Sequence, residues 1–184
     1  MPLRFILVLI ISLAISPSIS AQVLMGMDTK LSDDFTAWNL YADADTGDEE
    51  GEIALRYAVA SAPESWRFSI AGESGTIRQV FADDPTLWQV NCGNQRITAR
   101  QVWRGDTTEW RITDNDGVTF TIKSRYSGDL NEWVVDHPVY GFMEVYTAYE
   151  NDMREWVIVD DMSGEVCVGM KICAVFLAMD NSRP

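Results

Sequence analysis

The sequence predicts an all-β protein built from about five tandem β-hairpin repeats of 22–23 residues. We expect the hairpins to form an antiparallel meander, closed into a shallow, radially symmetric barrel of 10–12 strands. Tryptophan marks the repeat, because it recurs at intervals of 22, 22, 23 and 23 residues. The residues of this column are Trp66, Trp88, Trp110, Trp133 and Trp156. Self-similarity at a fixed period of this length is typical of repeat architectures.

Two further columns keep the same register. An aromatic residue lies seven positions before each of the last four tryptophans, and an aspartate follows each aromatic by three positions. The aromatics are Phe81, Trp103, Tyr126 and Tyr149, and the aspartates are Asp84, Asp106, Asp129 and Asp152. An earlier tryptophan, Trp38, precedes Trp66 by a looser interval of 28 residues. Agreement between three columns indicates that the repeat is structural.

Each repeat reads as two strands and two turns. The first strand starts at the tryptophan and alternates in polarity, as in residues 110–113. A turn such as Asp114-Asn115-Asp116-Gly117 follows, and its residues tolerate positive φ or bond their own backbone. The second strand is longer and rich in Thr, Ile, Val and aromatic residues, over 76–81, 97–103, 118–126 and 142–149. Closing such hairpins into a ring removes the unpaired edges of an open sheet, although an open twisted sheet and a two-sheet sandwich are the alternatives.

The two ends of the chain differ from the repeats. Residues 1–20 have the anatomy of a cleavable secretory signal, with Arg4, an apolar run and small residues before Ala21. We therefore expect an exported protein, periplasmic, cell-surface or secreted, with no transmembrane segment in the mature chain; an uncleaved anchor helix is the alternative. Residues 21–37 are interpreted as an N-terminal arm and 38–184 as one repeat-built domain. No segment shows a 3.6-residue period, so we expect an acidic loop over 43–52 and a last strand or strands over 166–179.

Charge and cysteine usage limit the partners. The chain has 28 acidic against 14 basic side chains, a formal charge of −14, and losing Arg4 makes it more negative. Such a surface repels nucleic acid, which we exclude as a partner. Cys92, Cys167 and Cys173 are an odd number, so they cannot all pair within one chain. A disulfide from Cys92 to one of the others and buried free thiols are equally compatible with the sequence.

Catalytic chemistry finds little support in the residues. The single histidine, His137, precedes Pro138 in a turn position, and no triad, phosphate loop or metal set can be argued from spacing. We predict no catalytic residue, no metal and no cofactor. The recurring acids are turn residues, where aspartate bonds the local backbone. A secreted carboxylate-based hydrolase is the enzyme alternative, because the distance between two carboxylates is not visible in sequence.

One basic column contrasts with the acidic composition. A base lies three residues before the aromatic column in four repeats, at Arg56, Arg78, Arg100 and Lys123. Alternation puts Thr76, Thr98 and Thr121 on the same strand face, and Leu55, Ile77, Ala99, Ile122 and Val145 on the other. If the basic face lines the barrel axis, four cations converge on a central mouth that would bind a carboxylate, sulfate, phosphate or lipid head group. Alternatively, each base pairs with a repeat acid such as Asp84 or Glu109 on a neighbouring hairpin.

The recurring Trp-x-(Val/Ile) steps and the Thr-(Ile/Ala)-Arg-Gln-Val strands at 76–80 and 98–102 carry a family resemblance. Over residues 38–180 the chain resembles the bacterial β-flower domains, shallow symmetric barrels of radiating hairpins. Their architecture is similar to the Tubby C-terminal domain, a barrel that binds phosphoinositide lipid, although likeness of fold does not transfer function. The last unit departs from the pattern, with Gly169 and Ile172 in place of the basic and aromatic residues.

The functional hypothesis is an exported, non-enzymatic domain that binds a small anionic ligand or an anionic lipid head group through the basic column. A structural or protein–protein interaction module of the cell envelope, with a protein partner, is the alternative.

Overall fold

Twelve strands alternate buried and exposed side chains across the part of the chain that the structure describes. This computed structural model describes residues 23–32, 34–44, 47–57 and 63–183, so the predicted signal segment 1–20 lies outside it. The strands are β1 (Val23–Leu31), β2 (Asp34–Ala44), β3 (Gly47–Tyr57), β4 (Ser65–Ile70), β5 (Glu73–Phe81), β6 (Asp84–Cys92), β7 (Gln95–Gln101), β8 (Glu109–Thr113), β9 (Thr119–Tyr126), β10 (Asp129–His137), β11 (Gly141–Tyr149) and β12 (Asp152–Met162).

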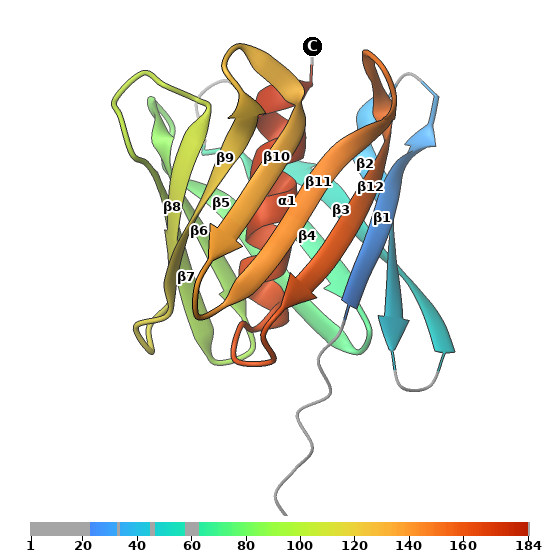
Figure 1. Cartoon of the computed structure of the whole chain (residues 1–184), viewed down its shortest axis with the longest axis horizontal. Coiled ribbons are helices and arrows are strands. Elements are labelled where there is room, and N and C mark those ends of the chain that lie inside the picture. The colour runs from blue at the N-terminus through green and yellow to red at the C-terminus, as the bar shows by residue number, and fades with distance from the viewer. Residues whose placement is uncertain (1–22, 33, 45–46, 58–62, 184) are drawn as a thin grey trace, which may run out of the picture.

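Each strand pairs with its neighbours in sequence, and β1 pairs with β12, so the sheet is a closed barrel (Figure 1). All pairings are antiparallel, and the closing register places Gly26 opposite Val157. The predicted all-β meander closed into a barrel is therefore confirmed. Closure pairs the strand edges that an open sheet would expose.

The segment interpreted as an N-terminal arm and the segment predicted as an acidic loop both contain strands. β1 falls within the segment interpreted as an N-terminal arm, and it closes the barrel between β2 and β12. The prediction of an acidic loop over 43–52 was wrong, because β2 and β3 pair as far as Ala44 and Gly47. Their outward positions can carry acids such as Glu50 without cost, because that face meets water.

The last element corrects the prediction of a terminal strand over 166–179. Residues Val168–Ser182 form helix α1, which runs through the interior of the barrel (Figure 1). Nearly every side chain from Gly169 to Met179 is buried, on all sides of the helix. The barrel wall surrounds the helix, so it needs no polar face and shows no 3.6-residue period in sequence. The length of the apolar run, longer than a usual strand, was the signal for a helix.

The tryptophan column packs between the wall and this helix. Each even-numbered strand carries one buried tryptophan, at Trp38, Trp66, Trp88, Trp110, Trp133 and Trp156. Phe176 of α1 meets the Trp66 and Trp88 rings edge-on, at centroid distances of 5.5 and 4.9 Å. Four of the indole N–H groups donate to the carbonyl three residues earlier, as Trp110 does to Thr107 at 2.9 Å. Satisfying the N–H in this way allows so large an aromatic surface to be buried.

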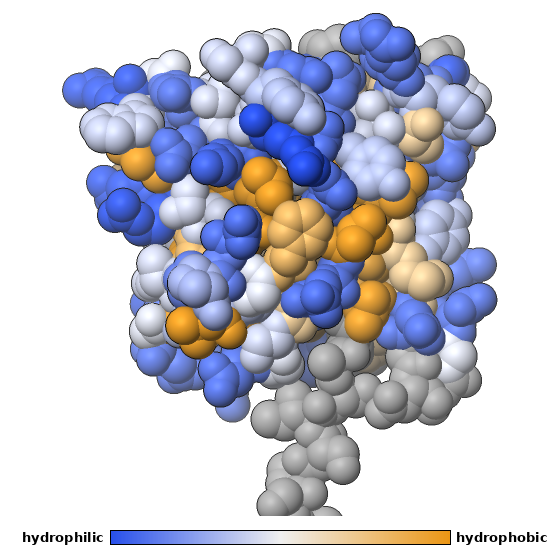
Figure 2. Space-filling model, viewed as in Figure 1, coloured by the Kyte–Doolittle hydropathy of each residue, from blue (hydrophilic) through white to orange (hydrophobic). Residues whose placement is uncertain are grey.

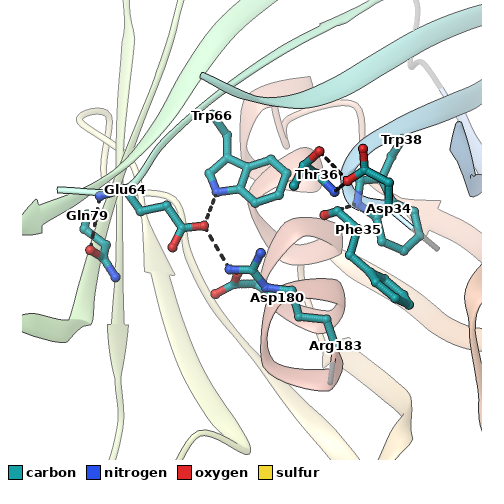
Figure 3. A network of polar contacts seen from close by, with 9 residues as sticks. All are labelled: Asp34, Phe35, Thr36, Trp38, Glu64, Trp66, Gln79, Asp180 and Arg183. Atoms are coloured by element: carbon teal, nitrogen blue, oxygen red, sulfur yellow. Dashed lines mark hydrogen bonds and ion pairs between the residues drawn. The ribbon is translucent and has the colours of Figure 1, made fainter. Parts of the chain in front are cut away.

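The repeat aspartates close the turns. Asp106 Oδ1 accepts hydrogen bonds from the backbone N–H and the hydroxyl of Thr108, and Asp84 does the same with Thr86. Figure 3 shows the equivalent bonds between Asp34 and Thr36. The aspartate column thus serves the local turn, as its position in the repeat predicted.

Polar contacts hold both ends of α1 in the barrel. Near its start, Lys171 Nζ lies 2.9 Å from Asp160 Oδ2, and both side chains are almost fully buried. At its other end, Arg183 bonds Glu64 at 2.8 Å and lies over the Trp66 ring (Figure 3). Burial raises the pKa of Asp180, which lies 2.6 Å from Arg183, to about 6.

The three cysteines are free thiols. Burial raises the pKa of Cys92 to about 12 and raises that of Cys173 as well. Of the two alternatives that the sequence left open, the structure shows free thiols, with Cys92 and Cys173 buried and Cys167 half-buried.

Candidate anion-binding site

The predicted basic column lies on the outside of the barrel. Arg56, Arg78, Arg100 and Lys123 are exposed, on the alternate strands β3, β5, β7 and β9. Their strand neighbours Ile77, Ala99 and Ile122 point inward and are fully buried. The idea of cations converging on a central mouth is therefore wrong, because α1 fills the axis. The same four residues instead cross the outer wall.

We give the name basic wall to a set of outward positions on β5 to β9 that ends at Lys123. Its residues are Ser74, Thr76, Arg78, Leu87, Gln89, Asn91, Arg96, Thr98, Arg100, Glu109, Arg111, Thr113, Thr119, Thr121 and Lys123. Among these described positions, Glu109 is the single acid. Arg125, the next outward residue of β9, is ion-paired with Glu132 and lies at the edge of the wall. On a chain with a formal charge of −14, this wall gathers cations and hydroxyl groups on adjacent strands.

The register of the strands sets which side chains meet on this wall. Arg100 lies directly opposite Arg111 across β7 and β8. Arg111 in turn lies opposite Thr121, whose neighbour two residues on is Lys123. Side chains directly opposite each other have Cβ atoms roughly 5 Å apart, and diagonal neighbours are about 7–8 Å apart. Arg100, Arg111 and Lys123 are therefore within reach of one ligand.

The described acids nearest these cations form no ion pair with them. Glu109 lies opposite Lys123, but its Oε2 accepts the indole N–H of Trp103 at 3.0 Å. The Thr86 hydrogen bonds hold the pKa of Asp84 below its usual range, and the nearby positive charge of Arg100 and Arg104 lowers it further. Arg111 forms no hydrogen bond or ion pair with any residue that the structure describes. Salt bridges between hairpins therefore do not account for this part of the column.

A groove opens beside Arg100 between the β5–β6 and β7–β8 hairpins. Its volume is about 770 Å³, and its lining includes Phe81, Asp84, Arg100, Gln101 and Arg104. Gln101 is buried, and its side-chain oxygen accepts the backbone N–H of Gly105. The groove thus brings two guanidinium groups and an aromatic ring to the end of the basic wall where the β5–β6 and β7–β8 turns lie.

The opposite wall has a different character. Cations next to it are paired with acids: Arg125 at the end of β9 bonds Glu132 at 2.7 Å and also Glu144, and Lys30 of β1 bonds Glu52 at 2.6 Å. Figure 2 shows apolar side chains gathered among hydrophilic ones on the face that β10 to β12 form. The outward apolar residues of β10 to β12 are Val134, Phe142, Tyr146, Val157 and Val159.

Two sets of surface residues were missed by the sequence interpretation. Arg111 follows a tryptophan on an even-numbered strand, outside the basic column of the odd-numbered strands. Alternation along 110–113 makes it outward-facing. The exposure of the aromatic column was not predicted: Phe81, Trp103, Tyr126 and Tyr149 are 56–64 % exposed at the ends of hairpins. Their position beside turn residues was the feature of the sequence that could have predicted this exposure.

His137 has a structural role. Its ring stacks on Tyr140 at a centroid distance of 4.7 Å, and its Nδ1 accepts the backbone N–H groups of Val139 and Tyr140. Across the described ranges, His, Cys, Asp and Glu side chains form no group suited to hold a metal ion. A helix with the length and apolarity to span a membrane is also absent from the described residues.

Fold and surface together define a class: a closed twelve-stranded barrel of hairpins around a C-terminal helix, with one basic outer wall. Comparisons with family models, curated proteins and solved structures found no match for this chain.

Proposed function

We propose that this chain is an exported, non-enzymatic binding protein of the β-flower type, and that its basic wall binds an anion. Arg100 and Arg111 are the central binding groups, with Lys123 beside them and Arg78 at the flank. The hairpin repeat and the resemblance of its Thr-x-Arg-Gln-Val strands support the family, and the signal-like first twenty residues support export.

The observation that carries the proposal is the juxtaposition of Arg100 and Arg111. Like charges directly opposite each other in a sheet destabilise it, so two arginines in register reduce stability unless an anion neutralises them. An oxyanion between them would accept bidentate bonds from both guanidinium groups. Thr98, Thr113 and Thr121 present hydroxyl groups around the pair and can donate to the remaining oxygens.

The ligand chemistry is a phosphate, sulfate or carboxylate group held on an open surface. An open wall admits an anion that belongs to a larger molecule, either a free polyanion or the head group of a lipid. Both ligands would be recognised through the same anionic group. They differ in whether that group is on a dissolved molecule or on a lipid in a membrane.

Thermal unfolding against a panel of anions tests the proposal. Phosphate, sulfate, citrate and inositol hexakisphosphate would be compared with chloride at constant ionic strength. A ligand that binds only the folded state raises the unfolding midpoint, by about 2.7 kcal/mol of stability at a hundredfold excess over Kd. We expect a selective rise in wild type that is lost in Arg100→Gln/Arg111→Gln. Vesicles with and without anionic lipid supply the second arm, and a lipid source predicts co-sedimentation that the same variant abolishes.

Arg67 supplies the matched control. It occupies the same position after a tryptophan as Arg111, but its Nη2 lies 3.3 Å from Glu52 Oε1. Arg67→Gln should leave the anion response unchanged. An equal response in wild type and in the double variant at 100 and 111 would overturn the proposal.

A protein-interaction module is the second candidate, favoured by the apolar residues on the outer face of β10 to β12 (Figure 2). Val159 is 42 % exposed there, and charged residues surround the apolar ones, as in the core and rim of an interface. Sedimentation of the whole chain tests a second copy as the partner. Dimers in wild type and monomers in Val159→Lys would support this candidate, and monomers in both would remove a second copy from it.

A further inference from the structure

Five large apolar side chains stand exposed at one end of the barrel. The described turns that follow odd-numbered strands lie at the end where the C-terminus of α1 emerges, at the top of Figure 1, and we call this end the upper rim. Leu31, Phe81, Trp103, Tyr126 and Tyr149 lie at these turns and are 66, 56, 64, 57 and 64 % exposed. We call them the tip residues.

The tip residues are equivalent in the repeat, and the core does not use them. Each precedes the turn aspartate by three positions, including Leu31 before Asp34. The interior is filled by the buried tryptophans and by α1. Large aromatic side chains bury most of their surface in ordinary folds. Their repeated exposure to water at one rim therefore indicates a binding surface.

A fixed hydrogen-bond acceptor lies beside these rings. Oδ1 of Asp106 and of Asp129 bonds the turn, through Thr108 and Asn131. Within the described residues, the second oxygen of each carboxylate accepts no hydrogen bond. The bonds from Thr108 also hold the pKa of Asp106 below its usual range, so this acceptor stays ionised.

The rim chemistry excludes three ligand classes. Arg104 adjoins Trp103, so a cationic ligand is opposed at this tip, whereas Arg125 beside Tyr126 is paired with Glu132. Turn acids such as Asp83 and Asp106 oppose an anionic membrane. Polar turn residues separate the rings, which does not suit a protein partner, because protein interfaces have a contiguous apolar core. What remains is a neutral molecule with flat apolar faces and many hydroxyl groups.

We propose that the upper rim binds a neutral polysaccharide, with Trp103, Tyr126 and Tyr149 stacking on sugar rings while turn carboxylates accept hydroxyl bonds. This site adjoins the basic wall, because Trp103 donates to Glu109, but it does not depend on the proposed anion. Neighbouring tips are two strands apart, roughly 10 Å along the rim, so a linear glycan can contact successive tips. Linking several weak contacts multiplies affinity, so a hexasaccharide should bind at least tenfold more tightly than a monosaccharide.

Trp103 gives a direct spectroscopic test. The other six tryptophans are at most 2 % exposed, so acrylamide, a neutral quencher, will reach chiefly Trp103. Cellohexaose, chitohexaose and laminarihexaose would each be titrated into the whole chain, with glucose as the monomer. We expect one hexasaccharide to reduce quenching of Trp103 with saturation, and glucose to have little effect.

Variants separate this site from the basic wall. In calorimetry Trp103→Ala/Tyr126→Ala should lose binding tenfold or more with an unchanged unfolding midpoint, while Trp103→Phe retains binding. Val139→Ala, on an equally exposed residue at the opposite rim, is the matched control and should bind as wild type does. The proposal is overturned if no neutral hexasaccharide binds, or if binding survives the double variant. It is also overturned if only an acidic oligomer such as oligogalacturonate binds and Arg100→Gln abolishes that binding.

Discussion

Arg100 on β7 and Arg111 on β8 are direct register partners on the outer wall of the barrel, and neither forms an ion pair among the described residues. Elsewhere on the same barrel, outward arginines have acidic partners, as Arg125 has Glu132 and Arg67 has Glu52. The contrast identifies the basic wall as the place where a negative charge is missing.

Reversing the charge at position 111 should therefore raise the stability of the barrel, whereas most substitutions lower it. Arg111→Glu replaces a like-charge pair with an opposite-charge pair facing Arg100, so we expect stabilisation of about 0.2–1 kcal/mol. Arg67→Glu makes the reverse change beside Glu52 and should destabilise the barrel. Urea unfolding of both variants measures the change in the free energy of unfolding. Destabilisation by Arg111→Glu would show that Arg111 has a structural role.

The buried pair between Lys171 and Asp160 should be strongly coupled. Removing one partner leaves a charge inside the barrel, so Lys171→Met should lower the free energy of unfolding by about 3–5 kcal/mol. The double variant Lys171→Met/Asp160→Asn should recover most of this loss, because it leaves no buried charge. A double-mutant cycle in urea measures the coupling, and additive losses would contradict it.

Asp180 makes stability depend on pH. Its pKa is raised to about 6 in the folded chain, so folding favours the protonated form and stability falls as pH rises from about 4 to about 6. Asp180→Asn should gain about 1–3 kcal/mol at pH 7.5 and almost nothing at pH 4. Unfolding midpoints measured across this range would show curves that converge at low pH. Parallel curves would mean that the carboxyl is not buried as described.

The thiols should be unreactive in the folded protein. Burial raises the pKa of Cys92 to about 12, and Cys173 is fully enclosed, so neither presents a thiolate near neutral pH. Thiol titration at pH 8 should count fewer than one reactive group in the native chain. Three groups should react in denaturant without a reductant, and a lower count there would reveal a disulfide.

The sequence predicted those elements that have one face in water, because only these alternate between apolar and polar residues. The hairpins were predictable because one strand face meets water and the other meets the core, so Trp110, Ile112 and their equivalents alternate with polar residues. α1 was not, because a helix enclosed by a barrel is apolar on every side and loses its period. The pairing of β1 with β12, which closes the barrel, was not predictable either, because β1 contains no tryptophan and so does not show the repeat.

For a related reason, the sequence predicted which residues form the basic column but not where on the barrel they lie. The column of Arg56, Arg78, Arg100 and Lys123 followed from the repeat, but which face lined the axis did not, because only packing of Phe176 and its neighbours in α1 decides it. Arg111 belongs to another column, and its proximity to Arg100 is a property of strand register, which is set by the turns.

The most direct test of the basic wall is to follow the arginine side-chain Nε–Hε resonances of ¹⁵N-labelled protein during titration with inositol hexakisphosphate. The account predicts that the signals of Arg100 and Arg111 shift together with one saturating curve, while the signal of Arg67 stays in place. Uniform small shifts of all exposed arginines, or saturation at Arg67 first, would contradict a specific anion site on this wall.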